Sequence, residues 1–314
     1  MIKTGLYRIE DLTDLRKRYT VIGGYRRVSI ALLDQLRGHP DADAWAEHIL
    51  YLFADGRGAF KRTYQRRFEE FDAFCLEHIA RLCDRTRPLA VHDAAVSDGR
   101  TACDFFARLA AFNPQLSYAA SDYQPTLRII SKGAVSAVLD CRDLPLELVY
   151  PPFVFNLIQP ERYLTYPINY LFSRYATRVV LPRLLASYRA GTIPGREMTT
   201  FSPRATALAA GDQRFTLRAH DLLEPSPLGR LMDIVRVMNA LNPLYFSSVQ
   251  LAQVARHLFQ GLSEGGVLIV GSNEDAGSAV HGGIYQRTAA GFTLVAGQGR
   301  EHYAHQALID VRAG

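Results

Sequence analysis

Residues 89–111 read LAVHDAAVSDGRTACDFFARLAA, and this stretch decides the fold class. Leu89 to Asp93 is a short apolar run that predicts a β-strand. The loop Ala94 to Arg100 is built from small and polar residues around one glycine, and Thr101 to Ala111 has apolar residues at helical spacing. Strand, loop and helix in this order open a βαβ unit, so we expect a parallel sheet.

Further segments with the composition of buried strands continue the pattern. The helical stretch Ser247 to Leu262 precedes the last of them. Alternating strands and helices predict an α/β fold with a mostly parallel, seven-stranded, Rossmann-like sheet, helices on both faces and a ligand outside the carboxyl ends of the strands. The expected strands are Leu116–Ser121, Phe215–Ala219, Met232–Met238 and Val267–Gly271, with closing strands between Gly283 and Val311.

The chain is expected to contain two domains and an insertion. Apolar residues recur at spacings of three and four between Ile9 and Asp84, which predicts an N-terminal helical domain over residues 1–86. Residues 87–314 form the sheet domain. The stretch from about 123 to 212 is too long for a simple connection between two strands, so it predicts an inserted cap. Within it we expect a hairpin over Leu127–Asp140 and a helix over Tyr163–Arg189.

The composition excludes several classes of protein. Apolar residues make up 48% and charged residues 21% of 314 residues, which is typical of an ordered globular protein. The net charge of +5 comes from scattered basic residues and does not indicate nucleic-acid binding. No apolar run approaches the roughly 18 residues that span a bilayer, so we expect no membrane partner. The oligomeric state stays open, with a homodimer as one option.

The cysteines and histidines indicate neither disulfides nor a metal. The four cysteines have no C-x-x-C spacing and the N-terminus lacks a secretory pattern, so we expect a reduced, cytoplasmic protein. His92, His220 and His257 have no metal-ligand spacing, so each is expected to be structural and no metal is expected.

The loop after the first strand has neither the P-loop pattern nor three spaced glycines, so a pyrophosphate ligand is not expected. Small residues over a helix N-terminus can offer N–H groups to a carboxylate, and Asp93 or Asp98 is available to an ammonium group. The sequence therefore suggests a ligand with an amino-acid end.

Polar residues also follow the next strands. Asp122 ends the second strand, where an acid accepts both hydroxyls of a ribose. Asp221 follows the third strand, where it could accept from an adenine amino group with Leu222 against the ring, and Asn239 follows the fourth. A nucleoside joined to an amino acid describes S-adenosylmethionine, which we expect as the cofactor.

The segments Ala94–Gly99, Ala120–Asp122, His220–Leu223 and Asp233–Asn239, with Leu262–Glu274, resemble the chemotaxis-receptor (CheR-type) glutamate methyltransferases. These are class I S-adenosylmethionine enzymes with a helical N-terminal domain. The resemblance implies that Ser97, Gly99 and Thr101 line the methionine end, that Asp122 takes the ribose and Asp221 and Leu222 the adenine, and that Asn239, Ala240 and Tyr245 close the crevice. With Tyr123 beside Asp122, and with Asp93 and Asp98, these are the candidate cofactor-binding residues.

The chain also departs from that family. Arg100 and Thr101 stand where the family has a paired acid, and the aromatic-rich insertion replaces the receptor-docking element, so a protein glutamate substrate does not carry over. The leading hypothesis is methyl transfer to a small molecule in an enclosed pocket, which needs proximity, orientation and exclusion of water. Tyr170 and Tyr175 are the candidates for the substrate side because aromatic faces attract a sulfonium, and Asn239 completes the catalytic candidates.

Two alternatives remain open. In the first, the cofactor is itself the substrate and cyclises to azetidine-2-carboxylate and methylthioadenosine, as in azetidine-2-carboxylate synthases of the same fold. In the second, the chain is a non-catalytic S-adenosylmethionine-binding module.

Overall fold

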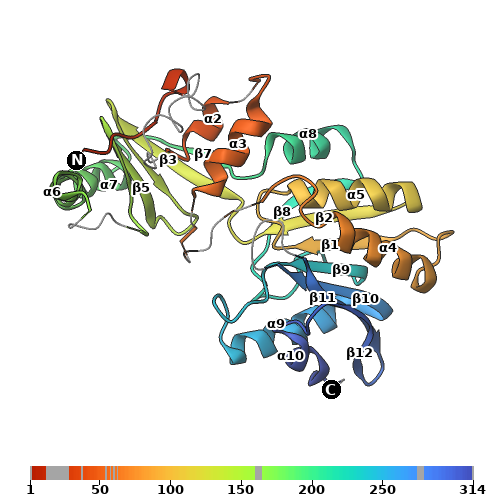
Figure 1. Cartoon of the computed structure of the whole chain (residues 1–314). Helices are drawn as coiled ribbons and strands as arrows, with labels where there is room; N and C mark the ends of the chain where they lie inside the picture. The colour runs from red at the N-terminus through yellow and green to blue at the C-terminus, as the bar shows by residue number, and fades with distance from the viewer. Residues whose placement is uncertain are drawn as a thin grey trace. The chain divides into compact units, whose positions relative to one another are not determined.

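The computed structural model describes residues 2–11, 28–36, 38–53, 55–56, 58, 61, 63–159, 165–273 and 279–312. These residues belong to two compact units (Figure 1). Met1–Arg62 and Thr126–Pro203 form one, which we call the insertion unit. Thr63–Pro125 and Arg204–Gly314 form the other, which we call the sheet unit.

The sheet unit contains a seven-stranded sheet in the order β12-β11-β10-β9-β1-β2-β8. The five strands from β8 to β10 pair in parallel, and β11 and β12 add an antiparallel edge, so the expected mostly parallel sheet is confirmed. The parallel strands, numbered along the chain, lie in the doubly wound order 3-2-1-4-5. The strands are β1 (Ala90–Ala94), β2 (Ser117–Asp122), β8 (Phe215–Ala219), β9 (Met232–Met238), β10 (Leu262–Ser272), β11 (His281–Thr288) and β12 (Gly291–Gln298).

Helices cover both faces of this sheet, as expected. Figure 1 shows α4 (Glu69–Leu82) and α5 (Arg100–Phe112) on one face, with α9 (Ser248–Gly261) and α10 (His305–Ile309) on the other. The α9 face shares one apolar core with alternate residues of β9 and β10. Helix α9 begins with a capping box between Ser247 and Gln250, and α8 (Pro203–Gly211) precedes β8. No helix of the described chain is long and apolar enough to cross a membrane.

The insertion unit is built on a second sheet, whose strands are all antiparallel and follow the order β6-β5-β4-β3-β7. The antiparallel pair β3 and β4 confirms the expected hairpin, with Gly133 at φ 61° in the turn. Helices α2 (Leu32–Gln35) and α3 (Ala42–Tyr51) contribute to the core on one face. The strands are β3 (Thr126–Lys132), β4 (Val135–Leu139), β5 (Pro145–Tyr150), β6 (Phe153–Asn156) and β7 (Gly195–Thr199), and a short 3-10 helix, η1, covers Ile9–Asp11.

A long helix covers the other face of the second sheet. It consists of α6 (Pro167–Tyr175), the π-helical turn η2 (Ala176–Val180) and α7 (Leu181–Arg189), and the residues that join these segments keep helical dihedrals. The helix expected over Tyr163–Arg189 is therefore observed from Pro167 onward, and Tyr163 lies outside the described residues.

The observed units differ from the expected division at residue 86. The first 62 residues belong with the insertion because Ile30, Leu32 and Ile49 share a buried core with Leu127 and Ile129 of β3. Helix α4 belongs instead to the sheet unit. The insertion contains a complete five-stranded sheet, of which the sequence indicated one hairpin.

Candidate functional site

The carboxyl ends of the central parallel strands meet at one edge of the seven-stranded sheet. Ala94 at the end of β1 pairs with Ser121 of β2 and with Val237 of β9, and Asp122 pairs with Ala219 of β8. The order reverses between β1 and β9, which is the switch point where doubly wound sheets bind ligands. Most of the cofactor-binding residues predicted from the sequence end these strands or follow them along the chain: Ser97, Asp98, Gly99, Thr101, Asp122, Tyr123, Asp221, Leu222, Asn239, Ala240 and Tyr245.

The loop after β1 has an unusual backbone. Ala95, Ser97 and Gly99 have φ values of 59°, 61° and 82°, so the left-handed conformation recurs at alternate residues. Residues with a Cβ seldom adopt this conformation, and such strain is concentrated at functional sites. Backbone hydrogen bonds help to hold the loop, from Val96 N–H to the Ser121 carbonyl at 3.0 Å and from Gly99 N–H to the Val96 carbonyl at 3.0 Å. Every second residue of the loop thus has a positive φ, a conformation that favours glycine, yet only the third of these residues, Gly99, is a glycine.

This strain predicts a difference between two neighbouring alanines. Ala95→Gly should leave the free energy of unfolding unchanged or raise it, because glycine removes the left-handed penalty of about 1–2 kcal/mol. Ala94→Gly, at a buried strand end with 1% exposure, should lower it by about 1 kcal/mol or more. Urea denaturation of both variants measures the difference, and a larger loss in Ala95→Gly would contradict the strain.

Asp122 is fixed as a hydrogen-bond acceptor beside this loop. Its carboxylate accepts from Ser97 N–H at 2.8 Å and from Gln124 N–H at 3.2 Å, and its carbonyl accepts from His220 N–H at 2.9 Å. The side chain is half-buried at the sheet edge. Both carboxylate oxygens therefore act as acceptors at the end of β2, since each oxygen takes one of these N–H groups.

The other two acids near the loop are paired with arginines. Asp98 forms an ion pair with Arg100 in which both side chains are fully buried, and it also accepts from Arg100 N–H at 3.1 Å. Asp93 accepts from Tyr118 Oη at 2.6 Å and from Arg236 Nη1 at 2.9 Å. Burial raises the pKa of Asp93, and Arg236 opposes the shift. Asp98 therefore stabilises the loop and Asp93 stabilises β1. The sequence did not indicate that either acid is paired with an arginine.

Arg236 lies at the centre of a buried network beneath the edge. Its side chain is 1% exposed, and its Nη2 donates to Asp72 of α4 at 2.8 Å while Nη1 donates to Asp93. Its guanidinium carbon lies 4.6 Å from the centroid of the Phe105 ring. Burial raises the pKa of Asp72 to about 6, although Arg236 lowers it. An arginine inside a buried-strand sequence was the available signal, because such a charge needs partners.

Asn239 ends β9 with φ 56° and joins two strand ends. Its Nδ2 donates to Asn273 Oδ1 at 2.7 Å, and its Oδ1 accepts from Asn273 N–H at 2.8 Å. Ala240 is half-buried, and Tyr245 is 41% exposed in the turn that follows. Thr101 is buried in the first turn of α5. The side chain of Asn239 therefore joins the ends of β9 and β10, and Asn273 is not among the site residues that the sequence indicated.

The residues after β8 are partly buried. Asp221 is half-buried and accepts from Leu223 N–H at 3.1 Å. Leu222 is 6% exposed and belongs to the core under α9. Its neighbour His220 donates its backbone N–H to the Asp122 carbonyl, which joins the ends of β8 and β2.

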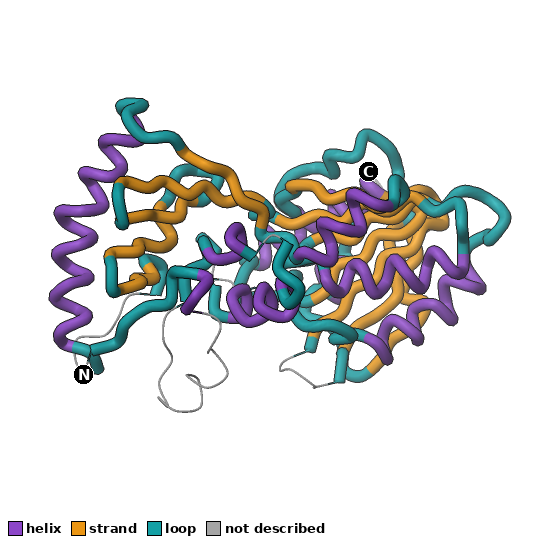
Figure 2. The backbone as a smooth tube through the Cα atoms, turned by 90° about the horizontal axis from the view of Figure 1, so that it is seen from above, coloured by secondary structure: helices purple, strands orange, loops and turns teal. Residues whose placement is uncertain are grey.

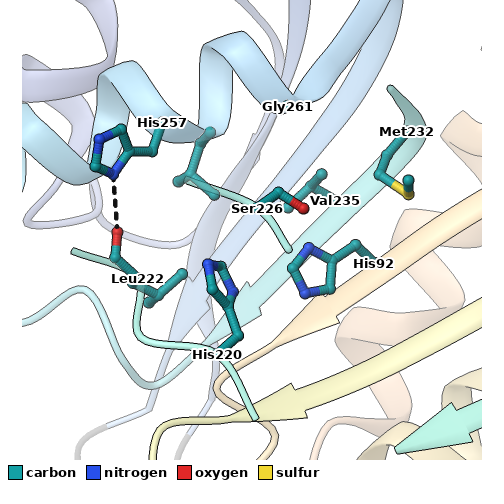
Figure 3. A pocket seen from close by; sticks show the side chains of 9 residues that line it. His92, His220, Leu222, Ser226, Met232, Val235, His257 and Gly261 are labelled. Carbon is teal, nitrogen blue, oxygen red and sulfur yellow. Dashed lines mark hydrogen bonds between the residues drawn. The ribbon is translucent and has the colours of Figure 1, made fainter. Parts of the chain in front are cut away.

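A small cavity lies beside Leu222 (Figure 3). Three histidines line it, and the ring centroids of His92 and His220 are 5.2 Å apart. His92 Nε2 is 2.8 Å from Ser121 Oγ, and His257 Nδ1 is 3.3 Å from the Leu222 carbonyl. Within the described ranges, no three His, Cys, Asp or Glu side chains are grouped so as to hold a metal.

The buried imidazole of His92 predicts a loss of stability in acid. Burial, with a contribution from His220, lowers its pKa from 6.5 to about 3. The unfolded chain therefore binds the extra proton between these values, and the stabilisation present above pH 6.5 is lost as the pH falls toward 3. The loss is about 1.4 kcal/mol per pH unit.

His92→Gln is the variant that isolates this effect. Other groups, such as His302 with a lowered pKa and Asp72 with a raised one, titrate in both proteins and cancel in the comparison. Between pH 6.5 and 5.5, wild type should lose about 1 kcal/mol more than the variant in urea denaturation, because the unfolded imidazole is only half protonated at pH 6.5. Equal losses in the two proteins would show that His92 does not stay neutral in the folded state.

The two tyrosines expected on the substrate side belong to the insertion unit. Tyr170 and Tyr175 lie on α6. Tyr170 Oη accepts from Arg174 Nη1 at 2.7 Å, and Tyr175 is 49% exposed with its ring centroid 6.3 Å from that of Tyr150. Both tyrosines therefore belong to a different unit from Asp122 and the loop after β1.

No protein-family model and no curated protein matches the chain. It is similar to the solved sugar N-methyltransferase KedS8 from Streptoalloteichus (11% identity, 68% of this chain, 58% of that chain, TM-score 0.32). It is also similar to an O-methyltransferase family protein from Burkholderia thailandensis (14% identity, 76% and 43%, TM-score 0.30). A third is the N-methyltransferase NodS from Bradyrhizobium japonicum with S-adenosyl-L-homocysteine (13% identity, 73% and 71%, TM-score 0.31).

The chain spans about half the length of the first solved structures that it matches. The TM-scores of the three structures all lie below 0.5.

Proposed function

We propose that the chain is an S-adenosylmethionine-dependent enzyme that transfers a methyl group to a small molecule. One observation carries the proposal: Asp122, at the end of the second parallel strand, is hydrogen-bonded to the backbone of the loop that follows the first. An acid at this place in a doubly wound sheet accepts the hydroxyls of a ribose.

The residues at the edge fit the nucleoside half of this cofactor. A carboxylate such as that of Asp122 can accept from both hydroxyls of a ribose, and Asp221 stands after the next strand for the base. The methionine half would lie over the loop Ser97–Gly99 and the first turn of α5. Asp98 and Arg100 neutralise each other there, so they shape the loop and add no net charge.

The bound cofactor would supply an electrophilic methyl group on its sulfonium. The residues of the chain would bind it, orient it and exclude water, which suffices for an in-line displacement. Asn239 would act as a positioning residue, since its amide is bonded to Asn273. Tyr170 on the substrate side, a small-molecule acceptor and a cytoplasmic location remain part of the proposal, whereas the exposed Tyr175 does not.

The experiment is binding followed by product analysis with the full chain. Isothermal titration with S-adenosylmethionine should show binding, and mass spectrometry after adding a small-molecule extract should show S-adenosylhomocysteine. Methylthioadenosine and azetidine-2-carboxylate without any acceptor would mean that the α-amine attacks the γ-carbon and breaks its bond to sulfur. Binding without turnover would leave a non-catalytic module, and the absence of binding would overturn the proposal.

A further inference from the structure

The outer side of α6 exposes a row of apolar side chains. Ile168, Leu171, Phe172 and Tyr175 are 38%, 63%, 43% and 49% exposed. Their spacing of three and four residues places them along one side of the helix. Phe172 stacks on Phe153 with ring centroids 4.9 Å apart, which anchors the row to the sheet and leaves Leu171 as its most exposed member.

Arginines accompany this row along the same long helix. Arg174, Arg178, Arg183 and Arg189 are all exposed, and no aspartate or glutamate occurs between Arg162 and Arg196. Arg174 lies over the ring of Tyr170, with its guanidinium carbon 5.5 Å from the centroid. The long helix, about 34 Å from Pro167 to Arg189, thus carries the apolar row near its start and exposed arginines from Arg174 to its end.

The inner side of the helix packs against the second sheet, which fixes the rotation of the helix about its axis and therefore the residues that face outward. Ala176, Leu181 and Leu184 are buried against Ile130 and Leu148 of the second sheet. Figure 2 shows the long helix lying along that sheet.

The N-terminal segment anchors the start of the helix. Asn169 is 2% exposed and accepts from Lys3 N–H at 2.8 Å, while its Nδ2 donates to the Lys3 carbonyl at 2.7 Å. The Lys3 ammonium lies 5.2 Å from the centroid of the Tyr166 ring, which adds a further cation at this end.

We propose that this helix face binds the surface of an anionic lipid bilayer. A helix with arginines and with Leu and aromatic side chains on its exposed side lies in the membrane interface, where the apolar groups enter the headgroup boundary and the cations meet anionic lipids. A nucleic acid would complement the charge alone and would leave Leu171 and Ile168 in water. The exposed apolar row and the exposed arginines together therefore favour an anionic lipid surface as the partner.

This inference goes beyond the proposed enzymatic function and does not depend on it. It also departs from the expectation of no membrane partner. That expectation rested on the lack of an apolar run that could span a bilayer, and a helix that lies on the surface needs no such run.

The test is flotation of the full chain with vesicles. Phosphatidylcholine vesicles containing about a third phosphatidylglycerol should carry the protein, and pure phosphatidylcholine vesicles should carry much less. Arg178→Glu with Arg183→Glu should lower the partition coefficient at least about fivefold for each arginine removed, and added salt should weaken binding. Leu171→Ser should weaken binding at every salt concentration.

Two controls show whether the helix face is responsible. Arg178→Lys with Arg183→Lys keeps the charge and should retain binding. Arg256→Glu changes the charge on an exposed position of α9 in the other unit and should bind vesicles like wild type. Circular dichroism establishes that each variant is folded before its binding is measured.

Other results would overturn the proposal. Equal binding to both kinds of vesicle, or binding that the helix variants leave unchanged, would exclude this face as a lipid site. A dimer in sedimentation analysis that Leu171→Ser abolishes would identify the face as an interface between two copies. Binding to a DNA duplex with the same arginine dependence, and no binding to vesicles, would assign it to nucleic acid.

Discussion

Arg236→Met is expected to lower the free energy of unfolding by about 3–5 kcal/mol, because it leaves two buried carboxylates without their cation. Asp72 is 2% exposed and Asp93 is 1% exposed, and Arg236 donates to both. Methionine fills much of the arginine's volume, so the loss measures charge more than packing. Urea denaturation at pH 7 provides the measurement.

Removing the carboxylates should reverse much of this loss. In the triple variant Arg236→Met, Asp72→Asn and Asp93→Asn, no uncompensated buried charge remains, so stability should recover by several kcal/mol. Arg236→Lys should lie between wild type and Arg236→Met, since one ammonium cannot copy the two directed bonds of the guanidinium. If the triple variant is no more stable than Arg236→Met, the network does not act through charge compensation.

The parallel strands could be predicted because their signal is local. Phe215–Ala219 and Met232–Met238 were predicted with the boundaries that the structure has. Strands buried on both faces read as nearly continuous apolar runs, and β9 is such a run apart from Asp233 and Arg236. Strand β10 begins earlier than predicted, at Leu262, because a register shift between Leu262 and Val267 accommodates Gly265 and Gly266 within the strand.

The insertion unit could not be predicted in the same way because its order depends on contacts that are distant along the chain. Glu147 of β5 is 7% exposed and accepts from Ser29 Oγ at 2.5 Å and from Ile30 N–H at 3.2 Å. These bonds join the N-terminal segment to the second sheet. Neither segment reveals its partner by periodicity, so the sequence predicts a separate helical domain over residues 1–86, whereas the structure joins the first 62 residues to the insertion unit.

For the candidate site, too, the local strand signal predicts the positions of the residues but not their side-chain partners. Parallel strand ends must meet at one edge, so the positions of Asp122, Asp221 and Asn239 followed from the strand pattern. The hydrogen-bond and ion-pair partners of the acids could not be predicted from that pattern. The sequence offers both Asp98 and Asp122 as acids that could bind the ligand, and only the folded chain shows that Arg100 neutralises the first while backbone N–H groups hold the second.

Asp122→Asn is expected to weaken the binding of S-adenosylmethionine about 10- to 100-fold, the change that loss of a hydrogen bond to a charged acceptor produces. The matched control is Asp310→Asn, an exposed acid in α10's C-terminal turn that should bind like wild type. Isothermal titration gives the dissociation constants. Part of the effect could be indirect, because the Asp122 carboxylate also accepts from Ser97 N–H and Gln124 N–H, and one amide oxygen cannot serve both groups as well.

A double-mutant cycle separates the direct contact from the change in the loop. Wild type and Asp122→Asn are each titrated with S-adenosylhomocysteine and with its 2′-deoxy analogue. If Asp122 accepts the ribose hydroxyl, the analogue binds wild type more weakly but binds the variant about as well as the parent compound does, since the contact is already lost. An equal penalty in both proteins would assign the whole effect to the loop, and the ribose would then have to be held by another residue at the sheet edge.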